Sequence, residues 1–153
     1  MIKTHYIIAL LAASLTLTAC ASSKPSKTIT VNGADALSAR TLEPGECGLF
    51  VWAGEARRFI LYSQAGQGAV LARDGKDVAL TAQPSATSGD LYGQIPIQSF
   101  TDPDGKPYAL SLTSATALDG GTRYDAGTWR HKDSAGWDVL TPVTGLSTCR
   151  PVA

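Results

Sequence analysis

The sequence predicts an all-β protein with one small antiparallel β-barrel or sandwich domain. From Leu49 onward, no apolar pattern keeps a helical period over three turns. Short apolar runs instead follow one another at roughly even spacing, with Gly- and Pro-containing turns between them, as in antiparallel sandwiches and barrels. In addition, Asp74-Gly75 lies between two such runs, and Asp-Gly in this position is the strongest short-range hairpin signal.

The first strands expected in the domain are apolar on both faces, which suits central strands. A turn joins Cys47–Trp52 to Arg58–Ser63. The Asp74-Gly75 turn then joins Ala69–Arg73 to Lys76–Thr81, because both central residues of a two-residue hairpin turn need positive φ.

The C-terminal half predicts further strands. Leu91–Thr101 is expected to be a broken strand, since Pro96 must lie at an edge or a bulge. Strict alternation over Tyr108–Thr113 predicts a half-buried strand with Tyr108, Leu110 and Leu112 inward. Three elements complete the prediction: a break at Asp119-Gly120-Gly121, a hairpin of Thr128–Lys132 and Trp137–Leu140, and a closing strand Val143–Cys149. The three tryptophans, Trp52, Trp129 and Trp137, are expected in or over the core.

The first 20 residues have the pattern of an exported protein. Lys3 gives a charged start, and Tyr6–Leu17 is an apolar run that is shorter than the about 20 residues needed to span a bilayer. Leu17-Thr18-Ala19-Cys20 resembles the bacterial lipobox, which implies lipid attachment to Cys20 and cleavage before it. An ordinary signal peptide with an incidental cysteine is the alternative interpretation.

The lipobox resemblance implies a chain in three parts. Residues 1–19 are a lipoprotein signal peptide, residues 20–45 a lipidated N-terminus and flexible tether, and residues 46–150 the β domain. A short strand at 28–32 and a short helical turn at 34–40 are expected before the domain. Ala21 after the lipidated cysteine favours the outer membrane, with the protein facing the periplasm and anchored by its acyl chains.

The same resemblance makes the cysteine count informative. Of the three cysteines, lipidation uses Cys20 and leaves Cys47 and Cys149. Because disulfides persist outside the cytoplasm, we predict that these two pair and close a loop of about 100 residues. Two free buried thiols are the alternative.

Charge and composition argue against several function classes. The chain has 13 Lys and Arg against 13 Asp and Glu, so it lacks the basic character that nucleic-acid binding requires. Processing removes His5 and leaves His131, expected at the surface, so a multi-histidine metal site is excluded within one mature chain. Asp102 and Asp104 before Gly105 are expected to form a plain turn.

Nucleophile elbows and phosphate-binding loops are also missing from the sequence. We therefore expect no metal, no cofactor and no enzymatic activity.

Two motifs point to a family. Asp74-Gly75-Lys76 followed by Ser88-Gly89-Asp90-Leu91-Tyr92 resembles the membrane-bound inhibitors of C-type lysozyme, small lipoproteins with a β-barrel domain. In that family a serine and a lysine reach the catalytic carboxylates of lysozyme, where a hydroxyl and an ammonium can bind two acids.

The resemblance implies Ser88 as the serine and Lys106 or Lys132 as the lysine. The family's later Trp-x-Lys-Gly is replaced by Asp104-Gly105-Lys106, and in Trp129-Arg130-His131-Lys132 the lysine is one residue too far from the tryptophan.

These observations predict a non-enzymatic, protein-binding envelope lipoprotein, most specifically a lysozyme-inhibitor-like protein. Such an inhibitor needs a protruding loop that presents Ser88 with a lysine. A structural or assembly lipoprotein with no lysozyme contact is the alternative, and it needs a broad apolar patch or an open sheet edge. A third option, a carrier of small apolar ligands, needs a cavity inside the barrel.

Overall fold

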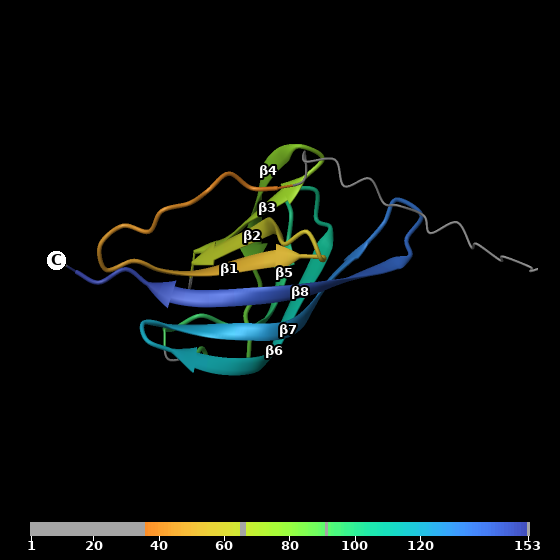
Figure 1. The fold of residues 1–153 in the computed structure, drawn as a ribbon. Helices are drawn as coiled ribbons and strands as arrows, with labels where there is room; N and C mark the ends of the chain where they lie inside the picture. Colours follow the sequence, from red (N-terminus) through yellow and green to blue (C-terminus); the bar gives the residue numbers. More distant parts are fainter. Residues whose placement is uncertain (1–35, 65–66, 91, 153) are drawn as a thin grey trace, which may run out of the picture. The chain divides into compact units, whose positions relative to one another are not determined.

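The computed structural model describes residues 36–64, 67–90 and 92–152. These residues form one closed antiparallel barrel in which each strand pairs with the next and β8 returns to β1 (Figure 1). The strands are β1 (Cys47–Ala53), β2 (Arg58–Gln64), β3 (Gly68–Arg73), β4 (Lys76–Ala82), β5 (Ile97–Thr101), β6 (Pro107–Leu118), β7 (Gly121–Lys132) and β8 (Asp138–Cys149). The predicted all-β, antiparallel fold class is therefore confirmed, and the architecture is the barrel.

The local turn signals were reliable. Asp74 and Gly75 have φ of 52° and 72°, which is the left-handed backbone that joins β3 to β4 in a tight hairpin. The strand expected over Leu91–Thr101 is shorter than predicted: β5 begins only at Ile97, after Pro96, and residues 92–96 lie in the loop before it. β6 and β7 are each 12 residues long, longer than the runs predicted from the sequence.

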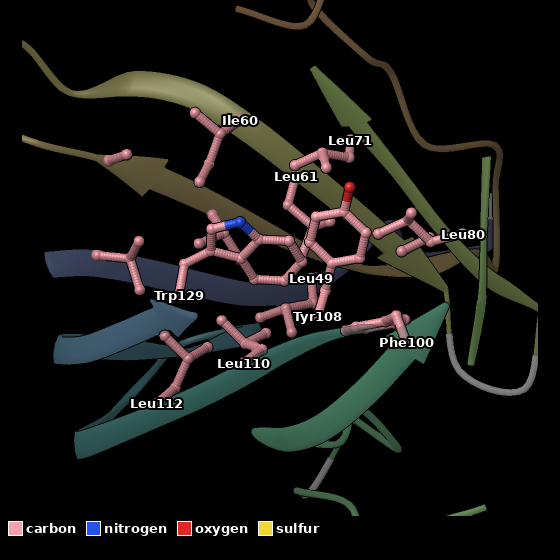
Figure 2. Packing of buried hydrophobic residues seen from close by; sticks show 14 of the residues in the cluster. Leu49, Ile60, Leu61, Leu71, Leu80, Phe100, Tyr108, Leu110, Leu112 and Trp129 are labelled. Atoms are coloured by element: carbon pink, nitrogen blue, oxygen red, sulfur yellow. The ribbon is translucent and has the colours of Figure 1, made fainter. Parts of the chain in front are cut away.

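The barrel interior is filled by apolar side chains contributed by all eight of the strands described (Figure 2). Tyr108, Leu110 and Leu112 point inward as their alternation predicted. Trp129 is buried with them, and the centroids of the Trp129 and Tyr108 rings are 5.4 Å apart. This packing does not favour a carrier of small apolar ligands, which would need the interior space.

The disulfide predicted between Cys47 and Cys149 is confirmed. The two residues are direct partners in the β1–β8 register and are separated by 102 positions in the sequence. The bond therefore joins the first strand of the barrel to the last at the place where the barrel closes.

Residues 36–46, here called the strap, lie on the outer face of β1–β3. Leu37 and Leu42 are buried there in a second cluster that includes Tyr62 and Ala72. The Leu37 N–H donates to the Phe59 carbonyl at 2.7 Å. The packed domain therefore extends N-terminal of the boundary expected at residue 46, and the described part of the predicted tether is a bound segment.

Other predictions for the N-terminal region remain as predictions or need correction. The helical turn expected at 34–40 is absent from its described part, which is irregular. The signal peptide, the lipidation site Cys20 and the strand expected at 28–32 lie outside the described residues. Within the part of the chain that is described, no helix is long and apolar enough to cross a membrane.

Candidate functional site

A groove crosses the outer face of β5–β8. It consists of two adjoining hollows of about 430 and 350 Å³ that share Ser99, Ala109 and Arg130. Because neighbouring strand residues point to opposite faces, these three side chains lie outside while Phe100, Leu110 and Trp129 fill the core. We call this region the β5–β8 groove. Its lining comes from the β4–β5 loop and from the four strands: residues 83–87, Ile97, Gln98, Ser99, Phe100, Thr101, Pro107, Tyr108, Ala109, Leu110, Ser111, Thr128, Arg130, His131, Lys132, Asp138 and Leu140.

The groove combines exposed apolar groups with polar ones. Ile97 and Leu140 are 49% and 63% exposed, and serine and threonine hydroxyls lie between them. At one end Lys132 Nζ lies 3.5 Å from Asp138 Oδ1, whereas Arg130 has no ion-pair partner among the described residues. This mixture can bind a polypeptide by apolar contact and by hydrogen bonds from hydroxyl and cationic groups.

The structure separates the serine and lysine candidates. Ser88 is exposed on the β4–β5 loop, and Lys106 is exposed on the β5–β6 turn at the other end of β5. Lys132 is exposed at the end of β7, next to the His131–Tyr108 pair of the β6–β7 register. The two lysines therefore lie at one end of the barrel, and neither is brought together with Ser88.

Ser88 and Lys132 instead border opposite ends of the groove. Thr87, next to Ser88, lines the first hollow, and Lys132 lines the second. The loop is fixed at the groove edge because Ser85 Oγ donates to the Ile97 carbonyl at 3.3 Å and accepts from the Thr87 N–H at 3.0 Å. The predicted site residues thus mark the limits of one surface rather than a single compact site.

Asp90 fixes the rest of the Ser88 loop. Its Oδ1 accepts from the backbone N–H groups of Tyr92 and Gln94, each at 2.9 Å. Its Oδ2 accepts from the Tyr124 hydroxyl at 2.9 Å. Burial raises the pKa of Tyr124, and the Asp90 carboxylate raises it further. The phenol therefore stays protonated at neutral pH and keeps the loop attached to β7.

A polar cluster closes the barrel end that carries the two lysines. The side chain of Asp102 is fully buried and pairs with Arg73; Tyr108 donates to it at 3.2 Å. The other oxygen of Asp102 accepts from the backbone N–H groups of Asp104 and Lys106, each at 2.9 Å. The predicted turn at 102–105 is present, and its first residue also anchors the barrel end.

The electrostatics of Asp102 follow from this arrangement. Burial opposes its ionisation, but Arg73, the Lys106 N–H and Tyr108 outweigh burial and hold the pKa of Asp102 below its usual value. Arg73 also lies 4.0 Å from Asp74 and 3.8 Å from Asp104. The charge of Arg73, which lines the 240 Å³ hollow at this end, is therefore met by three carboxylates, and the cluster has the character of a structural closure.

Two sequence-based expectations were wrong in this region. His131 is half-buried rather than exposed: its ring stacks on Tyr108 with centroids 6.1 Å apart, and its buried Nδ1 has no hydrogen-bond partner within the described part of the chain. Burial lowers the pKa of His131 in spite of nearby Asp133. Trp137 is 74% exposed and lies at the β7–β8 turn, outside the core.

Two further sources of information on function are a metal site and similarity to known proteins. The described ranges contain no cluster of three or more His, Cys, Asp or Glu that could hold a metal ion. Comparisons with protein-family models, curated proteins and solved structures found no match. The functional argument therefore depends on the groove and on the sequence motifs.

Proposed function

We propose that this protein is an envelope lipoprotein whose barrel binds a protein partner along the β5–β8 groove. The observation that carries the proposal is the exposure of Ile97 and Leu140 in a groove bordered by polar side chains. Exposed apolar surface with a polar rim is typical of interaction sites. The barrel is closed, with β4 and β5 paired only at Thr81–Thr101 and Ala82–Phe100. In this proposal the side chains that line the groove recognise the partner.

The envelope location rests on two further observations. The sequence Leu17–Cys20 supports lipid attachment at Cys20, and Ala21 after it supports anchoring to the outer membrane. The Cys47–Cys149 disulfide supports a location outside the cytoplasm. The barrel is then a periplasmic domain attached to a membrane through its own N-terminus.

C-type lysozyme is the specific partner that the family resemblance suggests. In this proposal Ser88 and Lys132 contact it at the two ends of the groove, because they do not form a pair. An envelope assembly partner is the second candidate, and the apolar part of the groove favours it. Both candidates use the same surface, and each is tested with its own set of variants.

The lysozyme arm uses the purified mature chain in its oxidised form. Inhibition of C-type lysozyme is measured for the unaltered chain and for Ser88→Ala, Lys106→Ala and Lys132→Ala. Sub-micromolar inhibition that is lost in Lys132→Ala but kept in Lys106→Ala, which is outside the groove lining, would support lysozyme as the partner. Absence of inhibition from a folded chain removes lysozyme and leaves the assembly partner.

The assembly arm uses photo-crosslinking residues in living cells. Crosslinkers at Ile97 and Leu140 should capture one defined envelope protein, and a crosslinker at Leu118 serves as a matched exposed control outside the groove. Leu140→Asp should abolish the capture from position 97. Equal capture from all three positions, or none from the groove, contradicts the proposal.

A further inference from the structure

The tip of the β7–β8 hairpin presents an exposed tryptophan on a well-ordered turn. Asp133 Oδ1 accepts from the backbone N–H groups of Ala135 and Trp137, each at 2.9 Å. The Asp133 N–H donates to the Trp137 carbonyl at 2.9 Å. These bonds hold the turn in one conformation, so the 74% exposure of Trp137 is a property of the fold. A side chain of this kind offers a large contact area at low entropic cost.

The hairpin projects beyond the β1–β2 end of the barrel. Ala53, the last residue of β1, pairs with Val143, so residues 138–142 of β8 continue past it. At about 3.3 Å per residue this extension is roughly 16 Å long. Figure 1 shows the β7–β8 hairpin reaching past the end of β1.

The strap begins at the same end of the barrel. Leu37 bonds to Phe59, which pairs with Trp52 next to the end of β1. From there the strap runs to the opposite end, where the Gly45 N–H donates to the Arg150 carbonyl at 2.8 Å. The chain that precedes residue 36 therefore leaves the barrel at the end where the hairpin projects.

If Cys20 carries the lipid, the exit of the chain at the hairpin end limits how far this end can lie from the membrane. Residues 20–37 can span at most about 60 Å even when fully extended, so a lipid at Cys20 keeps residue 37, and with it the hairpin end of the barrel, within about that distance of the bilayer. Such tethering raises the effective concentration of a second contact. A weak interaction between the hairpin and lipid then becomes significant without any strong affinity of its own.

We propose that Trp137 is a second membrane contact, which inserts into the interface of the bilayer that holds the lipid anchor. The inference rests on the proposed lipidation of Cys20. Tryptophan favours membrane–water interfaces because its ring is apolar while its N–H remains hydrogen-bonded. The charges of the hairpin balance, with Arg130 and Lys132 against Asp133 and Asp138, so the contact is apolar and requires no anionic lipid.

Chemical tethering tests this contact without natural lipidation. In the oxidised mature chain, Cys47 and Cys149 are bonded, so Cys20 is the one thiol left of the three cysteines. Cys20 is coupled to a maleimide phospholipid in phosphatidylcholine vesicles with brominated acyl chains, which quench tryptophans that contact them. The readout is tryptophan emission relative to vesicles with ordinary chains.

The expected result is quenching that is lost in Trp137→Phe and kept in Trp52→Phe, the matched control at a half-buried tryptophan on the barrel wall. Adding phosphatidylglycerol or salt should change the quenching little. Unchanged quenching in Trp137→Phe, or none in the unaltered chain, overturns the proposal. So does a result in which Trp137→Phe weakens capture from position 97 without any quenching, since Trp137 would then belong to the protein-binding surface.

The two proposals fail separately. Loss of quenching in Trp137→Phe with intact capture from the groove supports the membrane contact and the groove together. Quenching without any groove-specific capture retains the membrane contact and removes the proposed function.

Discussion

The barrel has an apolar outer face on β1–β3 and another on β5–β8, and among the described residues the chain covers only the first. On β1–β3, Tyr62 and Ala72 are buried beneath Leu37 and Leu42 of the strap. On β5–β8, the aliphatic side chains of Ile97 and Leu140 remain 49% and 63% exposed. The proposed binding of a partner to the second face rests on this contrast, because the strap shows how the fold covers an apolar face.

Polar contacts along the strap explain why the covered face stays closed. The Arg40 guanidinium lies 3.1 Å from Asp77 and over the ring of Tyr62. Glu46 accepts from the Glu43 N–H at 2.6 Å and from the Tyr62 hydroxyl at 2.7 Å, and both bonds lower the pKa of Glu46. No comparable set of contacts crosses the β5–β8 groove within the described residues.

The largest loss of stability should come from removing the Cys47–Cys149 disulfide, which lies at the C-terminal end of the strap. The paired variant Cys47→Ser and Cys149→Ser opens a loop of 102 residues, and the chain-entropy estimate for such a loop is about 4.7 kcal/mol of unfolding free energy. Denaturant unfolding of the oxidised chain and of the variant measures the difference. A loss below about 1 kcal/mol would mean that the strap and the β1–β8 register hold this end without the bond.

The second largest loss of stability should come from replacing Asp102, the buried carboxylate at the other end of the barrel. Asp102→Asn leaves Arg73 without its buried partner, and breaking such a pair costs about 3 kcal/mol, near the low end because the Arg73 side chain is 29% exposed. The pKa of Asp102 is lower in the folded state than the unfolded value of about 3.9. Its contribution is therefore complete above that unfolded value and is lost as pH falls through the folded pKa.

Denaturant midpoints measured between neutral and acidic pH test this pH dependence of the Asp102 contribution to stability. The difference between the unaltered chain and Asp102→Asn should shrink as the pH falls below about 4. A constant difference over the whole range would show that Asp102 acts through shape and hydrogen bonds rather than through charge.

Truncating Leu42 of the strap, which covers the β1–β3 face, should cause an intermediate loss of stability. Leu42 is 8% exposed, and truncating a buried leucine to alanine costs about 2 kcal/mol at the low end of the usual range. Leu42→Ala should lower the free energy of unfolding by about that amount, measured by denaturant unfolding. If it has no effect, the strap covers the face without stabilising it, and the contrast between the two faces loses its energetic basis.

Local signals account for what the sequence predicted correctly. The Asp74-Gly75 turn needs only the φ preferences of two residues, and the alternation from Tyr108 to Leu112 records one buried face. The Cys47–Cys149 pair followed from a count of cysteines and an expected compartment. The first two inferences use residues whose behaviour depends little on distant parts of the chain. The disulfide joins residues 102 positions apart and could be predicted because lipidation of Cys20 leaves only one possible pair among three cysteines.

The features that were missed depend on distant contacts. Leu37 and Leu42 are isolated apolar residues in a polar segment, and only β2 and β3 give them a surface to cover. Trp137 was expected near the core because tryptophan usually packs there, but the Asp133 turn holds it outside. The β5–β8 groove joins four strands and a loop, so no single stretch of sequence could indicate it.

The smallest effect on stability should accompany the largest effect on binding. Leu140→Ser and Ile97→Ser remove exposed side chains, so each should change the free energy of unfolding by at most about 0.5 kcal/mol. Capture of the partner should nevertheless fall about tenfold or more, which corresponds to about 1.4 kcal/mol of binding free energy.

Leu118→Ser, at an exposed residue outside the groove, is the matched control and should change neither the free energy of unfolding nor the capture of the partner. If the two groove variants destabilise the barrel as strongly as Leu42→Ala does, the open face is part of the fold's own packing, and the difference between the two faces is one of degree.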